Sequence, residues 1–344
     1  MRDDYVWDGS GEPDPEIQRL ESVLAVFRSS RPAPEFPERT TVWERWRKVT
    51  VHLSFAAVAS ATVLMIVWVA RRPAPPLEPS GWQVTRLAGT PRIGNSAVGG
   101  TGRLLVGQWL ETDAESRATL EVSATGRLEI DGGTRVQLVT SRPGHHLLSL
   151  SKGTIHAMIW APPGQFVVDT PSARAVDLGC AYSLHVDESG AGLVRVAFGW
   201  VGFEFKGHES FIPAGAVCAT RPGVGPGTPY FADSSQQLRD AIARLDFDRV
   251  DPRERAALLR TVLVESRKRD ALTLWHLLSR VNPDEDQLVY SRLSALVPPP
   301  PGVTREGVLK GDLQMLDLWW NELGFGDIRW WRKWERAWPQ QTSK

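Results

Sequence analysis

The residue types that most often carry out chemistry are sparse and scattered in this chain of 344 residues. Its seven histidines include one adjacent pair, His145-His146, but this pair follows Pro143-Gly144, a sequence typical of a turn rather than of a metal site. The sequence has no phosphate-binding glycine loop with Lys-Ser/Thr, no nucleophile elbow and no His-Glu-x-x-His motif. It therefore predicts a protein that is not an enzyme, with no catalytic residue, no metal and no cofactor.

Asp177 is the one acidic residue inside an otherwise apolar stretch, Val176-Asp177-Leu178-Gly179. Such an aspartate is explained better by burial or by capping of a loop than by catalysis, because a carboxylate readily accepts hydrogen bonds from loop amides. We therefore expect a structural role for Asp177.

The overall composition indicates a protein of folded domains and gives no sign of nucleic-acid binding. Forty Lys and Arg balance forty Asp and Glu, so no net field favours nucleic acid. A hydrophobic share of 42% and a charged share of 23% are typical of folded domains, and the length allows two or three of them. Tryptophan is unusually frequent, with 15 residues in total.

Residues 49–70 read VTVHLSFAAVASATVLMIVWVA, with no formally charged side chain. A helix of this length would span a bilayer core of roughly 30 Å. More basic residues flank its N-terminal side (Arg39, Arg45, Arg47, Lys48) than its C-terminal side (Arg71, Arg72, Arg86). By the positive-inside rule we expect a single-pass protein with residues 1–48 in the cytoplasm and the rest, after a linker at 71–81, on the far side.

The N-terminal segment contains one amphipathic helix between Pro13 and Arg31, followed by a proline-rich spacer. Its apolar face consists of Ile17, Leu20, Leu24 and Phe27. A lone amphipathic helix gains most of its stability by burying that face. A protein partner, the membrane surface and a frayed tail remain the alternatives for this segment.

Residues 82–220 change to short alternating apolar runs separated by Gly, Asp-Gly and Pro-Gly, the pattern of a mainly β domain that is sandwich-like or a β-solenoid. The expected strands are 104–106, 118–122, 126–130, 136–139, 147–150, 155–160, 166–169, 182–186, 193–198 and 202–206.

The order of motifs in this region resembles the FecR family. The segments that carry the resemblance are Gly107–Thr112, Gly126–Ile130, Gly133–Leu138, Leu148–Ile155, Phe166–Pro171, Val176–Gly179, Val194–Val201 and Ile212–Gly215. Members of this family are membrane-anchored regulators of extracytoplasmic-function sigma factors. The resemblance implies a periplasmic β domain, a place in the bacterial inner membrane and a cytoplasmic sigma-factor partner. The chain departs from the usual pattern at Gly179-Cys180-Ala181-Tyr182 and in the shortness of its N-terminal segment.

The two cysteines, Cys180 and Cys218, are too few and too far apart for a structural zinc site. In an oxidising periplasm they could form a disulfide, closing a loop of about 40 residues and stabilising the fold by roughly 3–4 kcal/mol. The alternative is two separately buried thiols, since free cysteine is among the most buried residue types.

An α-helical region follows the β domain. Helix starts are marked by Ser235, Asp251-Pro252, Asp270 and Asn282-Pro283, which predict a helical array over 234–297. After Pro298–Pro301, Thr304 is expected to cap a fifth helix that continues to about Leu323.

The last part of the segment 302–344 is rich in tryptophan. Trp330, Trp334 and Trp338 recur every four residues and Trp331 widens the same face, so a helix here would have an indole face and a basic rim. The face could pack on the neighbouring helices and β domain, lie on an anionic membrane surface, or stack on a ligand. Packing is the alternative that we predict.

Two hypotheses for function follow. In the first, the β domain senses an envelope signal, the membrane helix transmits it, and the N-terminal helix binds a sigma factor. In the second, the chain is an envelope structural or ligand-binding module without sigma-factor regulation. An envelope protein could be a partner under either.

Overall fold

The computed structural model describes residues 15–25 and 81–326, which belong to two compact units, Met1–Pro76 and Leu77–Lys344. In the first unit the described element is helix α2, Pro15–Leu24. None of the helices in the described ranges is long and apolar enough to cross a membrane. The predicted transmembrane segment 49–70 lies outside the described residues.

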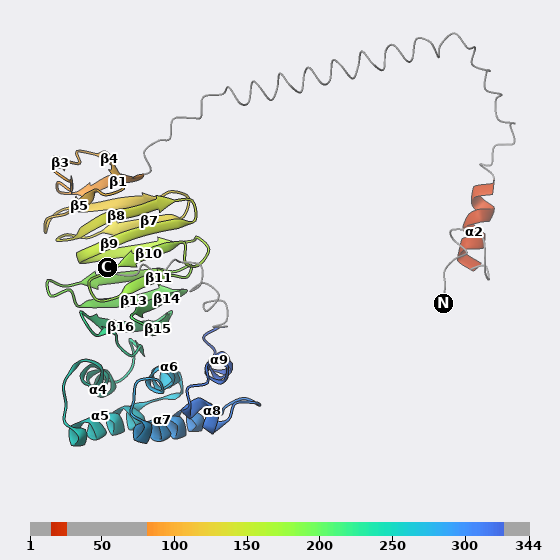
Figure 1. Ribbon diagram of the computed structural model, residues 1–344. Helices are drawn as coiled ribbons and strands as arrows, with labels where there is room; N and C mark the ends of the chain where they lie inside the picture. The colour runs from red at the N-terminus through yellow and green to blue at the C-terminus, as the bar shows by residue number, and fades with distance from the viewer. Residues whose placement is uncertain (1–14, 26–80, 327–344) are drawn as a thin grey trace, which may run out of the picture. The chain divides into compact units, whose positions relative to one another are not determined.

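The second unit begins with strands and ends with helices (Figure 1). Its strands are β1 Gly81–Ala88, β2 Arg92–Ile93, β3 Ser96–Ala97, β4 Thr101–Leu105, β5 Trp109–Glu111, β6 Arg117–Val122, β7 Gly126–Ile130, β8 Arg135–Arg142, β9 His145–Ile159, β10 Phe166–Asp169, β11 Arg174–Asp177, β12 Ala181–Val186, β13 Gly192–Phe198, β14 Trp200–Phe205, β15 His208–Pro213, β16 Ala216–Arg221, β17 Gly225–Pro226 and β18 Tyr230–Phe231. Its helices are α4 Gln236–Phe247, α5 Pro252–Glu265, the 3₁₀ turn η2 Lys268–Asp270, α6 Ala271–Leu277, α7 Pro283–Leu296, α8 Arg305–Leu309 and α9 Leu313–Glu322.

The strands form two sheets that share the long strand β9. Sheet A runs in the order β4-β1-β6-β7-β9-β12-β13-β16, and sheet B runs in the order β3-β2-β5-β8-β9-β10-β11-β14-β15. Within each sheet the strands follow chain order, from β6 to β16 in sheet A and from β5 to β15 in sheet B, which gives the stack visible in Figure 1. Of the pairs formed by described strands, only β9 with β10 is parallel, so the domain is closer to the sandwich-like prediction than to a parallel solenoid.

Strand β9 crosses from one sheet to the other at a glycine. Lys152 still pairs with Arg135 of β8 in sheet B, whereas Gly153 already pairs with Val186 of β12 in sheet A. Gly153 has φ +94°, and a Cβ there would lie 2.3 Å from the Cα of Thr134. Only glycine adopts this conformation in so little space, so the residue type allows the crossing.

The two sheets enclose one apolar core because alternate side chains of each strand face inward. Strand β7 shows the alternation clearly, with Gly126, Leu128 and Ile130 buried and Arg127 and Glu129 exposed. The predicted strands all fall on observed ones, with one difference: 147–150 and 155–160 are a single strand, β9. Periodicity could not reveal this, because both halves alternate equally well on either side of Gly153.

The helical region confirms the predicted helix starts. Ser235 accepts the backbone N–H of Leu238 at the start of α4, and Asp251 accepts those of Arg253 and Glu254 at the start of α5. The predicted fifth helix is wrong as a single element, because it divides into α8 and α9. Gly311, at φ +73°, ends the first, and Asp312 caps the second by accepting from Gln314 and Met315.

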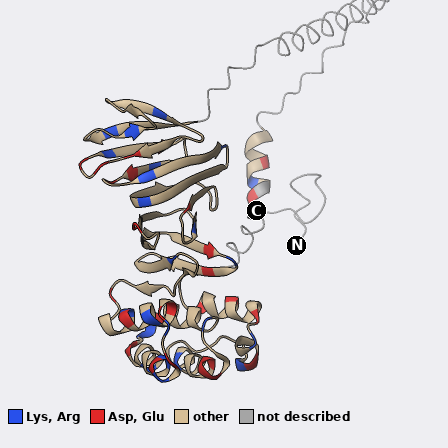
Figure 2. Cartoon of the chain, turned by 60° about the vertical axis from the view of Figure 1, so that its left-hand side comes forward, with Lys and Arg blue, Asp and Glu red and all other residues tan. Residues whose placement is uncertain are grey.

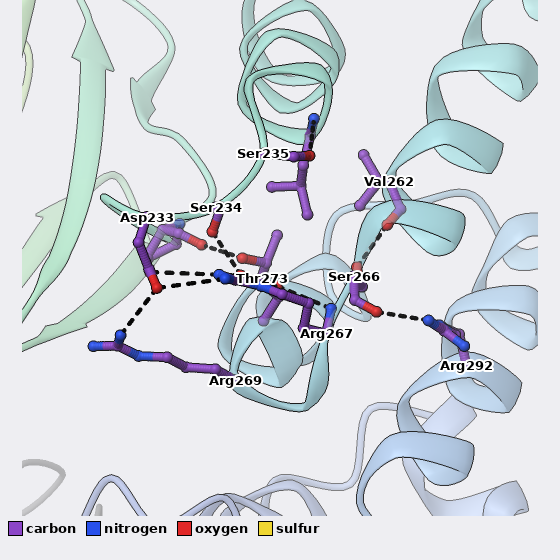
Figure 3. A network of polar contacts seen from close by, with 12 residues as sticks. Asp233, Ser234, Ser235, Val262, Ser266, Arg267, Arg269, Thr273 and Arg292 are labelled. Carbon is purple, nitrogen blue, oxygen red and sulfur yellow. Dashed lines mark hydrogen bonds and ion pairs between the residues drawn. The ribbon is translucent and has the colours of Figure 1, made fainter.

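A polar network fixes the helical region to the last strands of the β domain (Figure 3). The buried carboxylate of Asp270 accepts the hydroxyl of Ser234 at 2.6 Å and pairs with Arg267 at 2.8 Å. Asp233 lies between the guanidinium groups of Arg267 and Arg269. Asp270 was predicted as a cap, but its side chain makes no capping bond to α6 and instead connects that helix start to the chain leaving β18.

A second connection lies at the centre of the same junction. The guanidinium of Arg280 donates to the carbonyl oxygens of Pro226 and Glu209 and to the hydroxyl of Ser210, all at 2.7–2.8 Å. Beside it, the N–H of Phe211 donates to Nε2 of His276 at 3.0 Å. These bonds join β15 and β17 to α6 and to the turn that follows it, and the strands and helices of this unit share one continuous core.

Acidic and basic residues are interspersed along the strands and helices (Figure 2). The balance of positive and negative charge in the composition therefore also holds locally. Oppositely charged side chains form ion pairs, such as Arg255 with Glu285 and Arg174 with Asp169.

Candidate functional site

The outer face of sheet A has a groove of about 570 Å³ that crosses β7, β9, β12 and β13. We call it the outer groove, and its lining side chains are Arg127, Glu129, His156, Met158, Ala181, Ser183, Arg195 and Ala197. They come from positions that point away from the core, and cross-strand registers place them in rows, such as Glu129 opposite His156 and His156 opposite Ser183.

Polar side chains line part of the outer groove. Arg127 pairs with Glu121 of the neighbouring strand at 2.7 Å, and Nε2 of His156 lies 2.9 Å from Asp131. These contacts are exposed and contribute little to stability, so their side chains can exchange partners at small cost. These polar side chains can therefore form hydrogen bonds with an incoming segment.

An apolar patch adjoins the outer groove and shares Met158 and Ala181 with it. We call it the corner patch, defined by Met158, Trp160, Ala181 and Phe198. Phe198 belongs to it because of a β-bulge: Tyr182 pairs with Val196 but Ala181 pairs with Phe198, so the extra residue turns the Phe198 ring to the outer face. Ala181 also lies opposite Met158, which completes a ladder across three strands.

Helix α2 presents the second exposed apolar surface, on the unit that contains the predicted partner-binding residues. Leu20 and Leu24 are 60% and 56% exposed, and Val23, which the sequence reading did not include, is 63% exposed. Ile17 lies within α2, and Phe27 lies outside the described residues. Val23 could have been recognised from its position three residues after Leu20 on the same turn of helix.

Asp177 is both buried and loop-capping, which confirms its predicted structural role. It ends β11, where one carboxylate oxygen accepts the N–H of Gly179 at 2.7 Å and the other accepts the thiol of Cys180 at 2.8 Å. Removal from water raises the pKa of Asp177 to about 7. The site is too enclosed for a substrate, since Asp177 is 1% exposed.

The structure does not bring Cys180 and Cys218 together, so of the two alternatives it has the separately buried thiols and not the disulfide. Cys218 lies opposite Val194 of β13, whereas the neighbour of Cys180, Ala181, lies opposite Phe198. Val194 and Phe198 are four residues apart on β13, so the two cysteines are offset by about 13 Å along the strands. This distance is well beyond the reach of a disulfide. Both are free, buried thiols, and burial raises the pKa of Cys218 to about 12.

The histidine pair lies at the start of β9, after the predicted turn. His146 is buried, its Nε2 is 3.2 Å from the hydroxyl of Thr125, and burial lowers its pKa. Within residues 15–25 and 81–326, no three His, Cys, Asp or Glu side chains lie close enough together to hold a metal ion. The indole face of Trp330, Trp331, Trp334 and Trp338 lies outside the described residues.

Residues 108–202 match the model of the FecR protein family. The β region contains a FecR domain. The match runs from β5 to the start of β14, inside the stretch 107–215 that carries the resemblance in the sequence. All residues that line the outer groove, 127 to 197, fall within the FecR domain.

Two crystal structures of a proposed anti-sigma factor from Parabacteroides distasonis ATCC 8503 are similar to this chain, with 14% and 13% identity and a TM-score of 0.32 each. Each similarity covers 40% of this chain and 64% of the other, so the chain spans less than two thirds of their length. Comparison with curated proteins gave no match.

Proposed function

We propose that the chain is a membrane-anchored envelope regulator that controls a sigma factor in response to a periplasmic signal. Residues 49–70 cross the bacterial inner membrane, the N-terminal segment is cytoplasmic, and the FecR domain and helical region are periplasmic. The protein acts by binding and not by catalysis. The FecR domain supports this proposal, because the family consists of such regulators.

The observation that carries the cytoplasmic part of the proposal is the bare apolar face of α2. Leu20, Val23 and Leu24 are all more than half exposed. Burying one leucine stabilises a complex by about 2 kcal/mol, so this face can contribute strongly to binding. An amphipathic helix that lies in a partner's groove through i, i+3 and i+4 side chains is a common mode of recognition. A sigma factor is the partner implied by the family.

The test compares two charge-matched double variants of the full chain, purified from its native host with the proteins that bind it. Leu20→Asp with Leu24→Asp places two carboxylates on the apolar face, whereas Gln18→Asp with Ser22→Asp places two on the opposite face. We expect the first variant to recover at least tenfold less sigma factor than the wild type and to alter transcription from promoters of that factor.

The control variant should bind like the wild type. If the wild-type chain recovers no sigma factor, or if both variants bind it equally, the regulatory proposal fails. Transcription is compared only between variants that are present in the membrane in equal amounts. A change in transcription then reports a loss of regulation and not a loss of the protein.

A second candidate function is an envelope structural or ligand-binding module without sigma-factor regulation. The outer groove favours it, because an open groove lined by both polar and apolar side chains can bind an extended segment of an envelope protein. Under this function, neither α2 variant changes transcription, whereas substitutions in the outer groove impair the envelope.

A further inference from the structure

The outer groove joins a polar row of side chains to an apolar row. In the polar row, Ser183 of β12 lies opposite Arg195 of β13. Two residues further along the strands, about 7 Å away, Ala181 lies between Met158 and Phe198 in the apolar row. An occupant that spans both rows must therefore have one polar and one apolar end.

The apolar row is part of the corner patch. Phe198 is 71% exposed, and Met158 and Trp160 are 60% exposed. Exposed apolar side chains are ordinary when scattered, but a contiguous cluster marks a contact surface. The small side chains of Ala181 and Ala197 lie among these large ones on the lining of the groove, and they leave room for an apolar chain.

The charge in the polar row comes from Arg195. It is exposed on β13, and within the part of the chain that the structure describes it forms no ion pair and no side-chain hydrogen bond. Its planar guanidinium presents five N–H donors in a geometry that matches a carboxylate. The hydroxyl of Ser183 lies one strand spacing, about 5 Å, from Arg195 and can donate to the same anion.

The position of the acidic side chains shows which charge the polar end should have. Glu129 lies beyond His156, two strand spacings from Ser183, and Asp131 is already held by His156. Two residues along β7 from Glu129 lies the charged Arg127, so the apolar row does not continue beneath Glu129. The row does continue beneath Ser183 and Arg195, and an anionic end therefore fits the groove better than a cationic one.

The backbone of the groove favours a ligand without peptide groups. Strands β7, β9, β12 and β13 are all interior strands, each hydrogen-bonded to a neighbour on both sides. They leave no edge to which a peptide could add as a further strand. A peptide lying across them would bury its own N–H and C=O groups against side chains alone, whereas an acyl chain has no such groups.

We propose that the outer groove binds a free single-chain amphiphile with a carboxylate head. The carboxylate lies between Arg195 and Ser183, and the acyl chain crosses Ala181 onto Met158 and Phe198. The groove volume of about 570 Å³ is within the range of small-molecule sites. This inference goes beyond the proposed function and does not depend on a sigma factor.

The methyl signal of Met158 in nuclear magnetic resonance spectra tests the proposal. The chain has four methionines, Met1, Met65, Met158 and Met315, and the Met158 signal is the one that is lost in Met158→Leu. The full chain, labelled with ¹³C at the methionine methyl groups, is placed in phosphatidylcholine nanodiscs and titrated with octanoate. We expect the Met158 signal to shift to saturation while that of Met315, on α9, stays in place. Empty nanodiscs give the free octanoate concentration.

Two related probes test the charge of the head. Octan-1-ol has the same chain with a neutral head, and octylammonium has it with a cationic head. We expect each of them to require at least a fivefold higher free concentration than octanoate to shift the Met158 signal halfway. Acetate, which has the head without the chain, should leave the signal unchanged.

Full-length variants separate the polar contact from the apolar one. Arg195→Gln should weaken octanoate binding about fivefold without affecting octan-1-ol, while Arg142→Gln, an exposed arginine on β8, should affect neither. Phe198→Ser should weaken both ligands, and Leu87→Ser on β1, which is 52% exposed, should weaken neither. Ser183→Asp should reverse the preference, so that octylammonium binds more tightly than octanoate. An unchanged far-ultraviolet spectrum establishes that each variant is folded.

Three outcomes would overturn the proposal. The first is that octanoate shifts Met158 and Met315 alike or shifts neither, and the second is that octan-1-ol or octylammonium binds as tightly as octanoate. The third is that nanodiscs with anionic phosphatidylglycerol shift the Met158 signal in the absence of octanoate, because the membrane surface would then be the occupant. None of these outcomes bears on α2, so this proposal and the regulatory one can fail separately.

Discussion

At the scale of single residues, Asp177 shows how a buried carboxyl group is tolerated in the FecR domain. Its oxygens accept hydrogen bonds from Gly179 and Cys180, but no cation is among the causes that set its pKa, and loss of hydration dominates. The group is therefore held near neutrality at a strand end where the chain turns from one sheet to the other.

This arrangement predicts a pH dependence of stability. The pKa of Asp177 is about 7 in the folded state and 3.8 for an ordinary aspartate. Between these values the unfolded chain ionises while the folded one stays protonated, so the contribution of Asp177 is fully present below pH 4 and is lost as the pH rises through 7. In urea unfolding of residues 77–344, the wild type should lose up to a few kcal/mol over this range relative to Asp177→Asn. A difference between the two proteins that does not vary with pH would contradict the prediction.

At the scale of elements, the junction between β15, β17 and α6 depends on one side chain. Arg280 donates to three oxygens from two strands, and its charge faces the buried carboxylate of Asp246, which accepts from Thr228. The guanidinium presents five N–H donors in a rigid planar fork that spans these separated acceptors, whereas the ammonium of lysine presents three donors from one atom on a flexible stem.

We therefore expect Arg280→Lys to destabilise residues 77–344 by about 2–4 kcal/mol, since it leaves buried acceptors unpaired. Urea denaturation measures the effect. The same exchange at Arg253, which is exposed on the first turn of α5, should change the free energy of unfolding by less than 0.5 kcal/mol. Equal effects of the two exchanges would show that Arg280 does not hold the junction together.

At the scale of the whole molecule, the proposed topology puts residues 1–48 in the cytoplasm and the FecR domain and helical region in the periplasm. Protease added to intact spheroplasts should then digest the FecR domain and helical region but spare the segment before residue 49. An antibody against a tag at the N-terminus should detect a protected fragment that is lost only after detergent is added. Protection of residues 81–326 with cleavage of the N-terminal segment would reverse the topology.

The sequence alone determined the features that depend on neighbouring residues. Period-two alternation located the predicted strands, and Ser235 and Asp251 marked helix starts, because a cap acts on amides two or three residues away. The order of short motifs also identified the FecR domain, and the spacing of Leu20 and Leu24 defined the exposed face of α2. These inferences required no knowledge of which strands pair.

Only the tertiary structure decided the features that depend on register. The crossing of β9 at Gly153, the bulge that exposes Phe198 and the separation of Cys180 from Cys218 all follow from which residues lie opposite each other across strands. Residues far apart in the chain set these pairings, and a shift of one residue would reverse every side chain of a strand. The outer groove and its corner patch exist because four strands align in one register, which no local pattern in the sequence specifies.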